Sequence, residues 1–123
     1  MCAVSVMKIG GREVKVSDLK QKYINNIIDA AEKCDLIDRI VLFGSGIEDR
    51  CREESDLDLA VFGNLSRTKA LSSKKYERFA RQLYSFDDHR QAYDILYFKN
   101  DVNENSLILD NIRNGEIIYE RKK

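Results

Sequence analysis

The sequence predicts an α/β (α+β) fold in which helices flank a mixed β-sheet. Two kinds of hydrophobic pattern lead to this prediction. Apolar residues recur at helical spacing over residues 17–34 and again towards residue 84, whereas residues 40–43, 56–62 and 92–98 form short apolar or β-branched runs typical of strands. Because the two patterns alternate along the chain, we expect the helices to pack on a sheet whose strands they connect.

The chain is short enough to form one hydrophobic core. Its 123 residues fit a single domain, which we expect to span residues 1–123. Residues 1–16 are predicted to add an N-terminal hairpin extension, because valines alternate on both sides of Gly10-Gly11. These valines are Val4 and Val6 before the turn and Val14 and Val16 after it.

A first helix is predicted over residues 17–34. Ser17 is a suitable N-cap, and Asp18 suits the positive end of a helix. The run Ile40–Phe43 that follows is predicted to be a buried strand ending in the turn Gly44-Ser45-Gly46. The apolar face of the helix is formed by Leu19, Tyr23, Ile24, Ile27, Ile28 and Ala31.

The second half of the chain repeats the alternation of strand and helix. Strands are predicted over Asp56–Phe62 and Ala92–Phe98. Between them, a helix is expected to begin at Ser66 or Ser72 and to run to Tyr84. Its core-facing residues are predicted to be Leu71, Phe79, Ala80 and Leu83.

A short helix and a short strand are predicted to close the chain. Leu107, Ile108 and Ile112 mark the helix, and Gly115 stands where a C-terminal cap is expected. The strand follows at Ile117–Tyr119.

Charge and cysteine content exclude several classes of function. Twenty-one basic residues balance twenty-one acidic residues, so the basic excess typical of nucleic-acid binders is missing. The same balance leaves self-association into a homo-oligomer open. The three cysteines show no zinc-site or disulfide spacing, and no signal peptide or membrane span is visible. We therefore expect a reduced, soluble, cytoplasmic protein that does not contact a membrane.

The stretch that carries chemistry is Gly44-Ser45, then ten intervening residues, then Asp56-Leu57-Asp58. Side chains alternate on a strand, so Asp56 and Asp58 are expected to project from the same face. Two carboxylates at this spacing suit a hard divalent cation, Mg²⁺ or Mn²⁺. Gly44 would let the backbone approach a phosphate, and Ser45 would donate a hydrogen bond to it.

A third carboxylate is expected on a neighbouring strand, because two-metal sites usually need one. Asp94 is the best candidate, since it stands inside the apolar run Ala92–Phe98, where a buried charge is costly unless something pairs with it. Pairing with a lysine or a place at a strand edge is the alternative explanation for Asp94.

Each half of this pattern has a simpler explanation when taken alone. An Asp-x-Asp on a strand can be the solvent face of an edge strand, and a Gly-Ser after a strand is usually a turn. The spaced combination is rarer, at about one chance occurrence in several hundred sequences of average composition. Both halves also fall at strand ends, where open α/β sheets bind ligands. The combination therefore favours a functional site.

These residues resemble a known family. Leu42-Phe43-Gly44-Ser45, with Ser55-Asp56-Leu57-Asp58-Leu59-Ala60-Val61, is similar to the signature of the minimal nucleotidyltransferases of the DNA polymerase beta superfamily. The resemblance covers most of residues 17–120 and implies a palm-like nucleotidyltransferase fold.

The resemblance also implies roles for the site residues. Gly44 and Ser45 would contact the triphosphate of ATP, while Asp56, Asp58 and Asp94 would bind Mg²⁺ or Mn²⁺ and act in catalysis. Similar small proteins act as antitoxins, which transfer AMP from ATP to a tyrosine of a HEPN-domain partner protein. The expected function is thus metal-dependent transfer of a nucleoside monophosphate to a hydroxyl acceptor.

The chain departs from the family pattern after Gly44-Ser45. Glu48 stands where an arginine is common, although Arg50 or Arg52 could replace that arginine at a phosphate. This departure motivates an alternative, in which a catalytically weak nucleotide-binding module neutralises a partner toxin by contact. A lower-ranked alternative is transfer to a small molecule such as an antibiotic, which generally needs a further helical domain.

Overall fold

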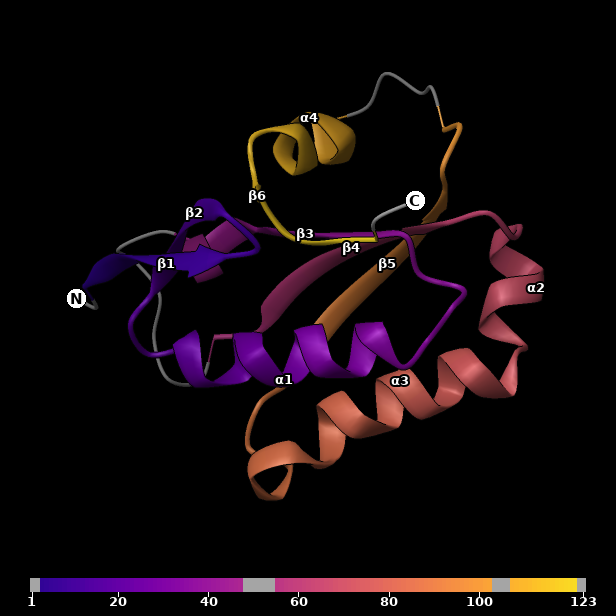
Figure 1. Ribbon diagram of the computed structural model, residues 1–123, viewed down its shortest axis with the longest axis horizontal. Helices are drawn as coiled ribbons and strands as arrows, with labels where there is room; N and C mark the ends of the chain where they lie inside the picture. Colours follow the sequence, from indigo (N-terminus) through magenta and orange to yellow (C-terminus); the bar gives the residue numbers. More distant parts are fainter. Residues whose placement is uncertain (1–2, 48–54, 103–106, 122–123) are drawn as a thin grey trace.

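The structure is a computed structural model that describes residues 3–47, 55–102 and 107–121. Its elements alternate strands and helices, as the sequence predicts (Figure 1). In chain order they are β1 (Val4–Ile9), β2 (Arg12–Ser17), α1 (Gln21–Glu32), β3 (Arg39–Phe43), the 3₁₀ helix η1 (Gly44–Ile47), β4 (Leu57–Gly63), α2 (Arg67–Leu71), α3 (Lys74–Ser85), the 3₁₀ turn η2 (Phe86–His89), β5 (Tyr93–Lys99), α4 (Leu107–Arg113) and β6 (Glu116–Glu120).

The N-terminal hairpin is present and extends slightly further than predicted. β1 and β2 pair antiparallel around Gly10 and Gly11, whose φ angles of 55° and 83° fit the left-handed positions of a tight hairpin turn. The register continues to the pair Val4 and Ser17, so the backbone at Ser17 is extended.

The predicted start of the first helix is therefore wrong. Ser17 belongs to β2, and α1 begins at Gln21 with Lys20 as its N-cap, without a side-chain capping hydrogen bond. The amide of Asp18 donates to the carbonyl of Ala3 at 2.8 Å, which ties this segment to the hairpin. Pairing with β1 outcompetes the capping preference of Ser17 because it also buries Val14 and Val16.

The four-stranded sheet has the order β5-β4-β3-β6. β4 runs parallel to β5, whereas β3 pairs antiparallel with both β4 and β6, so the sheet is mixed. All four strands lie where the sequence predicts them, within one or two residues. Asp56 lies one residue before β4, and Ala92 lies one residue before β5.

The helix predicted before residue 84 is two helices. Ser66 caps α2 by accepting from the Lys69 amide at 3.4 Å, and Ser73 caps α3 by accepting from the Lys75 amide at 3.2 Å. The break between them turns Leu71 outwards, where it is 48% exposed, so its predicted place in the core is wrong. Phe79 and Leu83 are buried as predicted.

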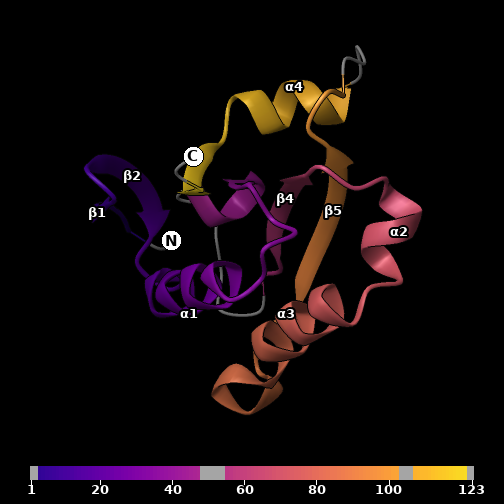
Figure 2. The same cartoon turned by 45° about the vertical axis from the view of Figure 1, so that its right-hand side comes forward.

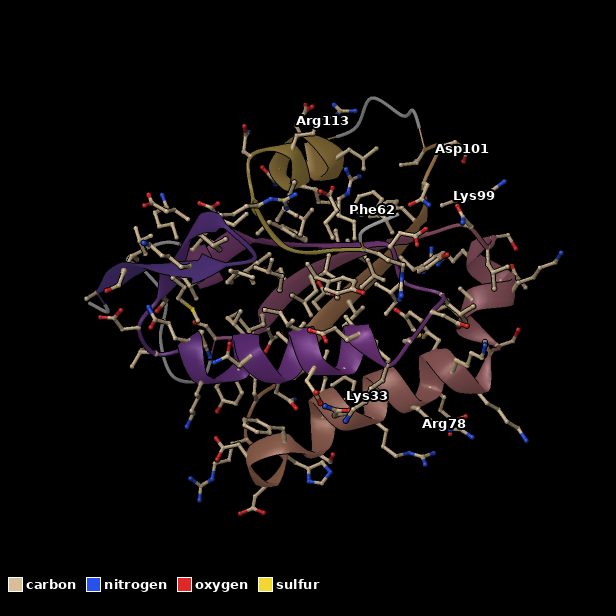
Figure 3. All side chains as sticks on the ribbon, viewed as in Figure 1. Lys33, Phe62, Arg78, Lys99, Asp101 and Arg113 are labelled. Atoms are coloured by element: carbon tan, nitrogen blue, oxygen red, sulfur yellow. The ribbon has the colours of Figure 1, made fainter. Side chains whose placement is uncertain are left out.

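Helices cover the two faces of the sheet unequally. α1 and α3 lie on one face, and of the helices that the structure describes only α4 lies on the other (Figures 1 and 2). Leu57, Leu59 and Val61 of β4 join the core with α1 and α3, while Ala60 and Phe62 join a smaller cluster with α4. Figure 3 shows Phe62 between the sheet and α4. Within the described part of the chain, no helix has the length and apolar character needed to cross a bilayer.

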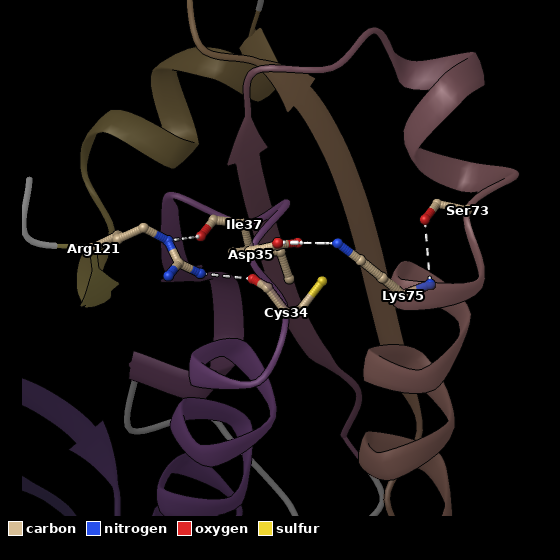
Figure 4. A network of polar contacts seen from close by, with 6 residues as sticks. All are labelled: Cys34, Asp35, Ile37, Ser73, Lys75 and Arg121. Atoms are coloured by element: carbon tan, nitrogen blue, oxygen red, sulfur yellow. Dashed lines mark hydrogen bonds and ion pairs between the residues drawn. The ribbon is translucent and has the colours of Figure 1, made fainter.

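Hydrogen bonds join the residue after the C-terminal strand β6 to the turn between α1 and β3. Arg121 donates from Nη2 to the carbonyl of Cys34 at 2.7 Å and from Nε to that of Ile37 at 3.0 Å (Figure 4). In the same turn, Asp35 forms an ion pair with Lys75 of α3 at 3.0 Å, which is also drawn in Figure 4. These contacts fix the end of the sheet that is opposite the start of β4.

Gly115 follows α4, as predicted, but its φ is not in the left-handed region. A Cβ at this position would lie 2.5 Å from the carbonyl oxygen of Leu42. Close approach of the chain to β3, and not a left-handed cap, is therefore the reason for glycine here.

Candidate functional site

Two acidic residues meet on neighbouring strands at one end of the sheet. In the parallel pair of β4 and β5, Asp58 stands in register with Asp94. Such residues share a face of the sheet, on strands roughly 4.8 Å apart. Alternation from Ala60 and Phe62 places Asp58 on the face that α4 covers, and Leu96 and Phe98 place Asp94 on the same face.

Asp56 lies two residues before Asp58, outside the regular strand. The amide of the intervening Leu57 donates to the carbonyl of Ala92 at 3.0 Å, so the parallel pairing begins here. Strand alternation would put Asp56 on the face of Asp58, at the rim of the sheet. The starting segments of β4 and β5, which carry the predicted acids, thus lie side by side at one end of the sheet.

The acids are more exposed than the sequence argument assumed. The side chains of Asp56 and Asp94 are exposed and that of Asp58 is half-buried. The idea that Asp94 is a costly buried charge is therefore wrong. α4 packs over Ala60 and Phe62, further along the face than Asp58 and Asp94. A solvated carboxylate can stay ionised without a paired charge.

Gly44 approaches the half-buried carboxylate of Asp58. Phe43 is the antiparallel partner of Asp58, and Gly44 follows it with φ of 71°, a left-handed conformation that favours glycine. A Cβ built on Gly44 would overlap the Asp58 carboxylate. The glycine therefore makes room for this acid. Its predicted contact with a phosphate stays a prediction, and the side chain of Ser45 lies outside the described part of the chain, as does Glu48.

The arrangement can be tested for its fit to a divalent cation. Among the described residues, no group of three or more His, Cys, Asp or Glu side chains is gathered closely enough to hold a metal ion. Mg²⁺ commonly takes only one or two protein carboxylates and completes its shell with water and substrate phosphates. The registered carboxylates of Asp58, which is half-buried, and Asp94, which is exposed, fit a cation that arrives with phosphates better than one held in a protein cage.

A buried polar network behind the acids was not predicted from the sequence. Lys20 is 1% exposed and donates from Nζ to the carbonyl of Ser55 at 2.6 Å and to Oε1 of Gln91 at 2.7 Å. Gln91, 3% exposed, donates from Nε2 to the carbonyls of Ser55 at 3.0 Å and Ala92 at 2.6 Å. The signal was available, because Lys20 continues the stripe of Ile24, Ile27 and Ala31 at helical spacing.

The turn that leads into this network has an unusual backbone. Asp87, Asp88 and His89 have φ angles of 58°, 55° and 64°, so three consecutive non-glycine residues are left-handed. Each such residue costs about 1–2 kcal/mol. The Tyr23 hydroxyl donates to Oδ2 of Asp87 at 2.6 Å, and Lys22 lies 3.1 Å from the same oxygen. These contacts hold the turn and lower the pKa of the Asp87 carboxyl, the Tyr23 hydrogen bond being the larger cause.

The comparisons with known proteins agree with the fold. A search of the curated proteins finds no match. The family model described as polymerase beta, nucleotidyltransferase matches residues 25–123, which leaves the N-terminal hairpin outside the match. The matched part contains the mixed sheet, Gly44 and all three predicted acids, and it spans well over half of the chain. The chain belongs to the polymerase beta nucleotidyltransferase family.

Proposed function

We propose that the protein transfers a nucleoside monophosphate, AMP from ATP, to a hydroxyl acceptor at the rim formed by the starts of β4 and β5. The observation that carries this proposal is the register of Asp58 with Asp94 on one open stretch of the sheet face. Membership in a nucleotidyltransferase family supports the reaction class. The proposed setting is the cytoplasm, where Cys34, a free thiol in the structure, would stay reduced.

The proposed chemistry balances as a single displacement. The acceptor oxygen forms a bond to the α-phosphorus of the nucleotide, the bond from that phosphorus to the bridging oxygen breaks, and pyrophosphate leaves. Together with the phosphates of the nucleotide, Asp58 and Asp94 would hold Mg²⁺ or Mn²⁺, which when bound neutralises the phosphate charge. Asp56, at the rim beside them, is the further proposed ligand. Asp94, the acid on the edge strand β5, would take the proton of the acceptor hydroxyl.

The proposed acceptor is a tyrosine of a HEPN-type partner protein. Support comes from the resemblance of the Gly44-Ser45 and Asp56-Leu57-Asp58 motifs to those of small antitoxin nucleotidyltransferases. The exposure of Asp94 on the edge strand β5 also suits an acceptor carried by another protein.

The test is transfer of label from α-labelled ATP, with Mg²⁺, to the product of the neighbouring gene. We expect labelled partner with the wild-type protein and at least about a hundredfold less with Asp58→Asn. Asp101→Asn is the matched control, because Asp101 is an exposed acid beyond the far end of β5. Absence of label with the wild type, or equal label with Asp58→Asn, would refute the transferase proposal. Neutralisation of the partner by Asp58→Asn in cells would then support inhibition by contact.

A further inference from the structure

We propose that Lys20 and Gln91 are positioning residues, which together hold the starts of β4 and β5 in the relation that the acidic site requires. This inference rests on the proposed function, because it concerns the same site. We call the network of Lys20, Gln91 and the Ser55 carbonyl the strand clamp. Both side chains are almost fully buried, so neither is exposed beside the acids.

The strand clamp joins the two segments that carry the acids. The Ser55 carbonyl, which immediately precedes Asp56, accepts from Lys20 Nζ at 2.6 Å and from Gln91 Nε2 at 3.0 Å. The Ala92 carbonyl, two residues before Asp94, accepts from Gln91 Nε2 at 2.6 Å. Each acid-bearing segment is thus held at a carbonyl within two residues of its acid.

The strand clamp also defines where parallel pairing begins. The Ala92 carbonyl accepts from the Leu57 amide at 3.0 Å as well as from Gln91, so the side-chain network continues directly into the strand ladder. That ladder sets Asp58 opposite Asp94. A shift of one residue in either strand would send one of these acids to the opposite face.

Packing alone does not explain a lysine at this position. Lysine is among the residues least often fully buried, because its ammonium group must leave water. An apolar side chain on the stripe of Ile24 and Ile27 would fill the core without removing an ammonium group from water. The Lys20 amine donates to the carbonyl of Ser55, next to Asp56. A site that needs its ligands in fixed positions would retain such a supporting hydrogen bond despite the cost of burial.

The experiment measures binding of Mn²⁺ with a non-hydrolysable ATP analogue, detected by the paramagnetic resonance of the ion. The variants are Lys20→Met and Gln91→Met, with Asp58→Asn as the site reference. Ile37→Ala is the matched control, because Ile37 is fully buried but lies at the opposite end of the sheet, next to the pair of the Asp38 amide and the Phe62 carbonyl. All measurements are made at a temperature where circular dichroism shows each variant folded.

We expect Lys20→Met and Gln91→Met each to weaken Mn²⁺ binding at least about tenfold, as loss of supporting residues commonly does. Ile37→Ala should lose thermal stability but keep the wild-type affinity. If Lys20→Met does not fold, Gln91→Met carries the test. If Asp58→Asn loses Mn²⁺ binding but the folded variants Lys20→Met and Gln91→Met keep the wild-type affinity, this inference is overturned and the proposed function stands. Equal binding by wild type and Asp58→Asn would instead overturn the proposed function.

Discussion

The two faces of the sheet are built from the same strands but differ in how completely helices cover them. On the face of α1 and α3, Leu57, Leu59 and Val61 are all at 0% exposure along the whole length of β4. On the opposite face, the corresponding row begins with the half-buried Asp58 and becomes core only at Ala60 and Phe62, under α4.

This difference shows how one short strand serves both the core and a site. Alternation assigns each residue of β4 to a face, but the helix above that face decides whether the residue is dry. α4 spans only seven residues, Leu107–Arg113, and a cavity of about 300 Å³ remains between it and the sheet. Because α4 packs on Ala60 and Phe62, Asp58 at the start of β4 is only half-buried and Asp94 on β5 is exposed.

The largest effect should come from truncating the fully covered face. Leu59→Ala is expected to lower the free energy of unfolding by about 3–4 kcal/mol, because the rigid core cannot fill the void. Ile112→Ala on α4, whose side chain is 4% exposed, should cost about 2 kcal/mol, since its surroundings are already loosely filled. Urea denaturation of both variants measures the difference, and equal losses would contradict the unequal packing of the two faces.

Gly44→Ala should affect the open face more than the fold. The new methyl group would overlap the Asp58 carboxylate and displace it, so we expect nucleotide-dependent Mn²⁺ binding to weaken at least about tenfold. Gly11→Ala is the matched control, because Gly11 has a left-handed φ of 83° but open space around its Cβ position. Both variants should lose about 1–2 kcal/mol of stability from backbone strain. Binding by Gly44→Ala equal to that of Gly11→Ala would show that the glycine matters only for the turn.

The acidity of the buried tyrosines gives a smaller, pH-dependent test of the covered face. Burial raises the pKa values of Tyr76 and Tyr93 above the ordinary value for tyrosine, because a charged phenolate would lie in the core. Because the pKa is raised in the folded state, the stabilisation from burying the neutral tyrosines is fully present below about pH 10, the ordinary tyrosine pKa. It is lost as the pH rises through the higher pKa of the folded state. We expect unfolding and phenolate absorbance to appear together in an alkaline titration.

Tyr76→Phe should move that alkaline transition to higher pH by less than about one pH unit, because the buried Tyr93 contributes in the same way. Tyr84→Phe is the control, because Tyr84 is 40% exposed. An alkaline transition of Tyr76→Phe at the same pH as that of the wild type would show that Tyr76 can ionise within the folded protein.

At low pH, the ion pair and hydrogen bond of Asp87 are expected to have an even smaller effect on stability. The Tyr23 hydrogen bond and Lys22 lower the pKa of Asp87, so their stabilising contribution is present above the ordinary aspartate pKa of about 4 and is lost as the pH falls through the lower, folded value. Tyr23→Phe should therefore flatten the loss of stability on acidification. A pH profile of thermal unfolding identical to that of the wild type would exclude a role for this bond in holding the left-handed turn.

Much of this protein follows from local sequence patterns. Alternating valines around Gly10-Gly11 determine the hairpin, and the apolar runs determine β3, β4 and β5, because burial on a pleated surface requires such side chains. The spacing of Asp56-Leu57-Asp58 and its resemblance to a family signature identified the candidate acids and the family. Each of these signals depends only on residues that are neighbours in the chain.

Tertiary structure decided what depends on distant partners. Pairing of Ser17 with Val4 overruled a helix cap, and the reach of α4 made Asp94 an exposed residue. The strand clamp joins Lys20 to Gln91, 71 positions apart, and no local pattern reports the hydrogen bonds that make a buried lysine tolerable. Burial and hydrogen bonding are properties of the assembled layers, so a sequence can name the residues of a site before it can say which are covered and what holds them.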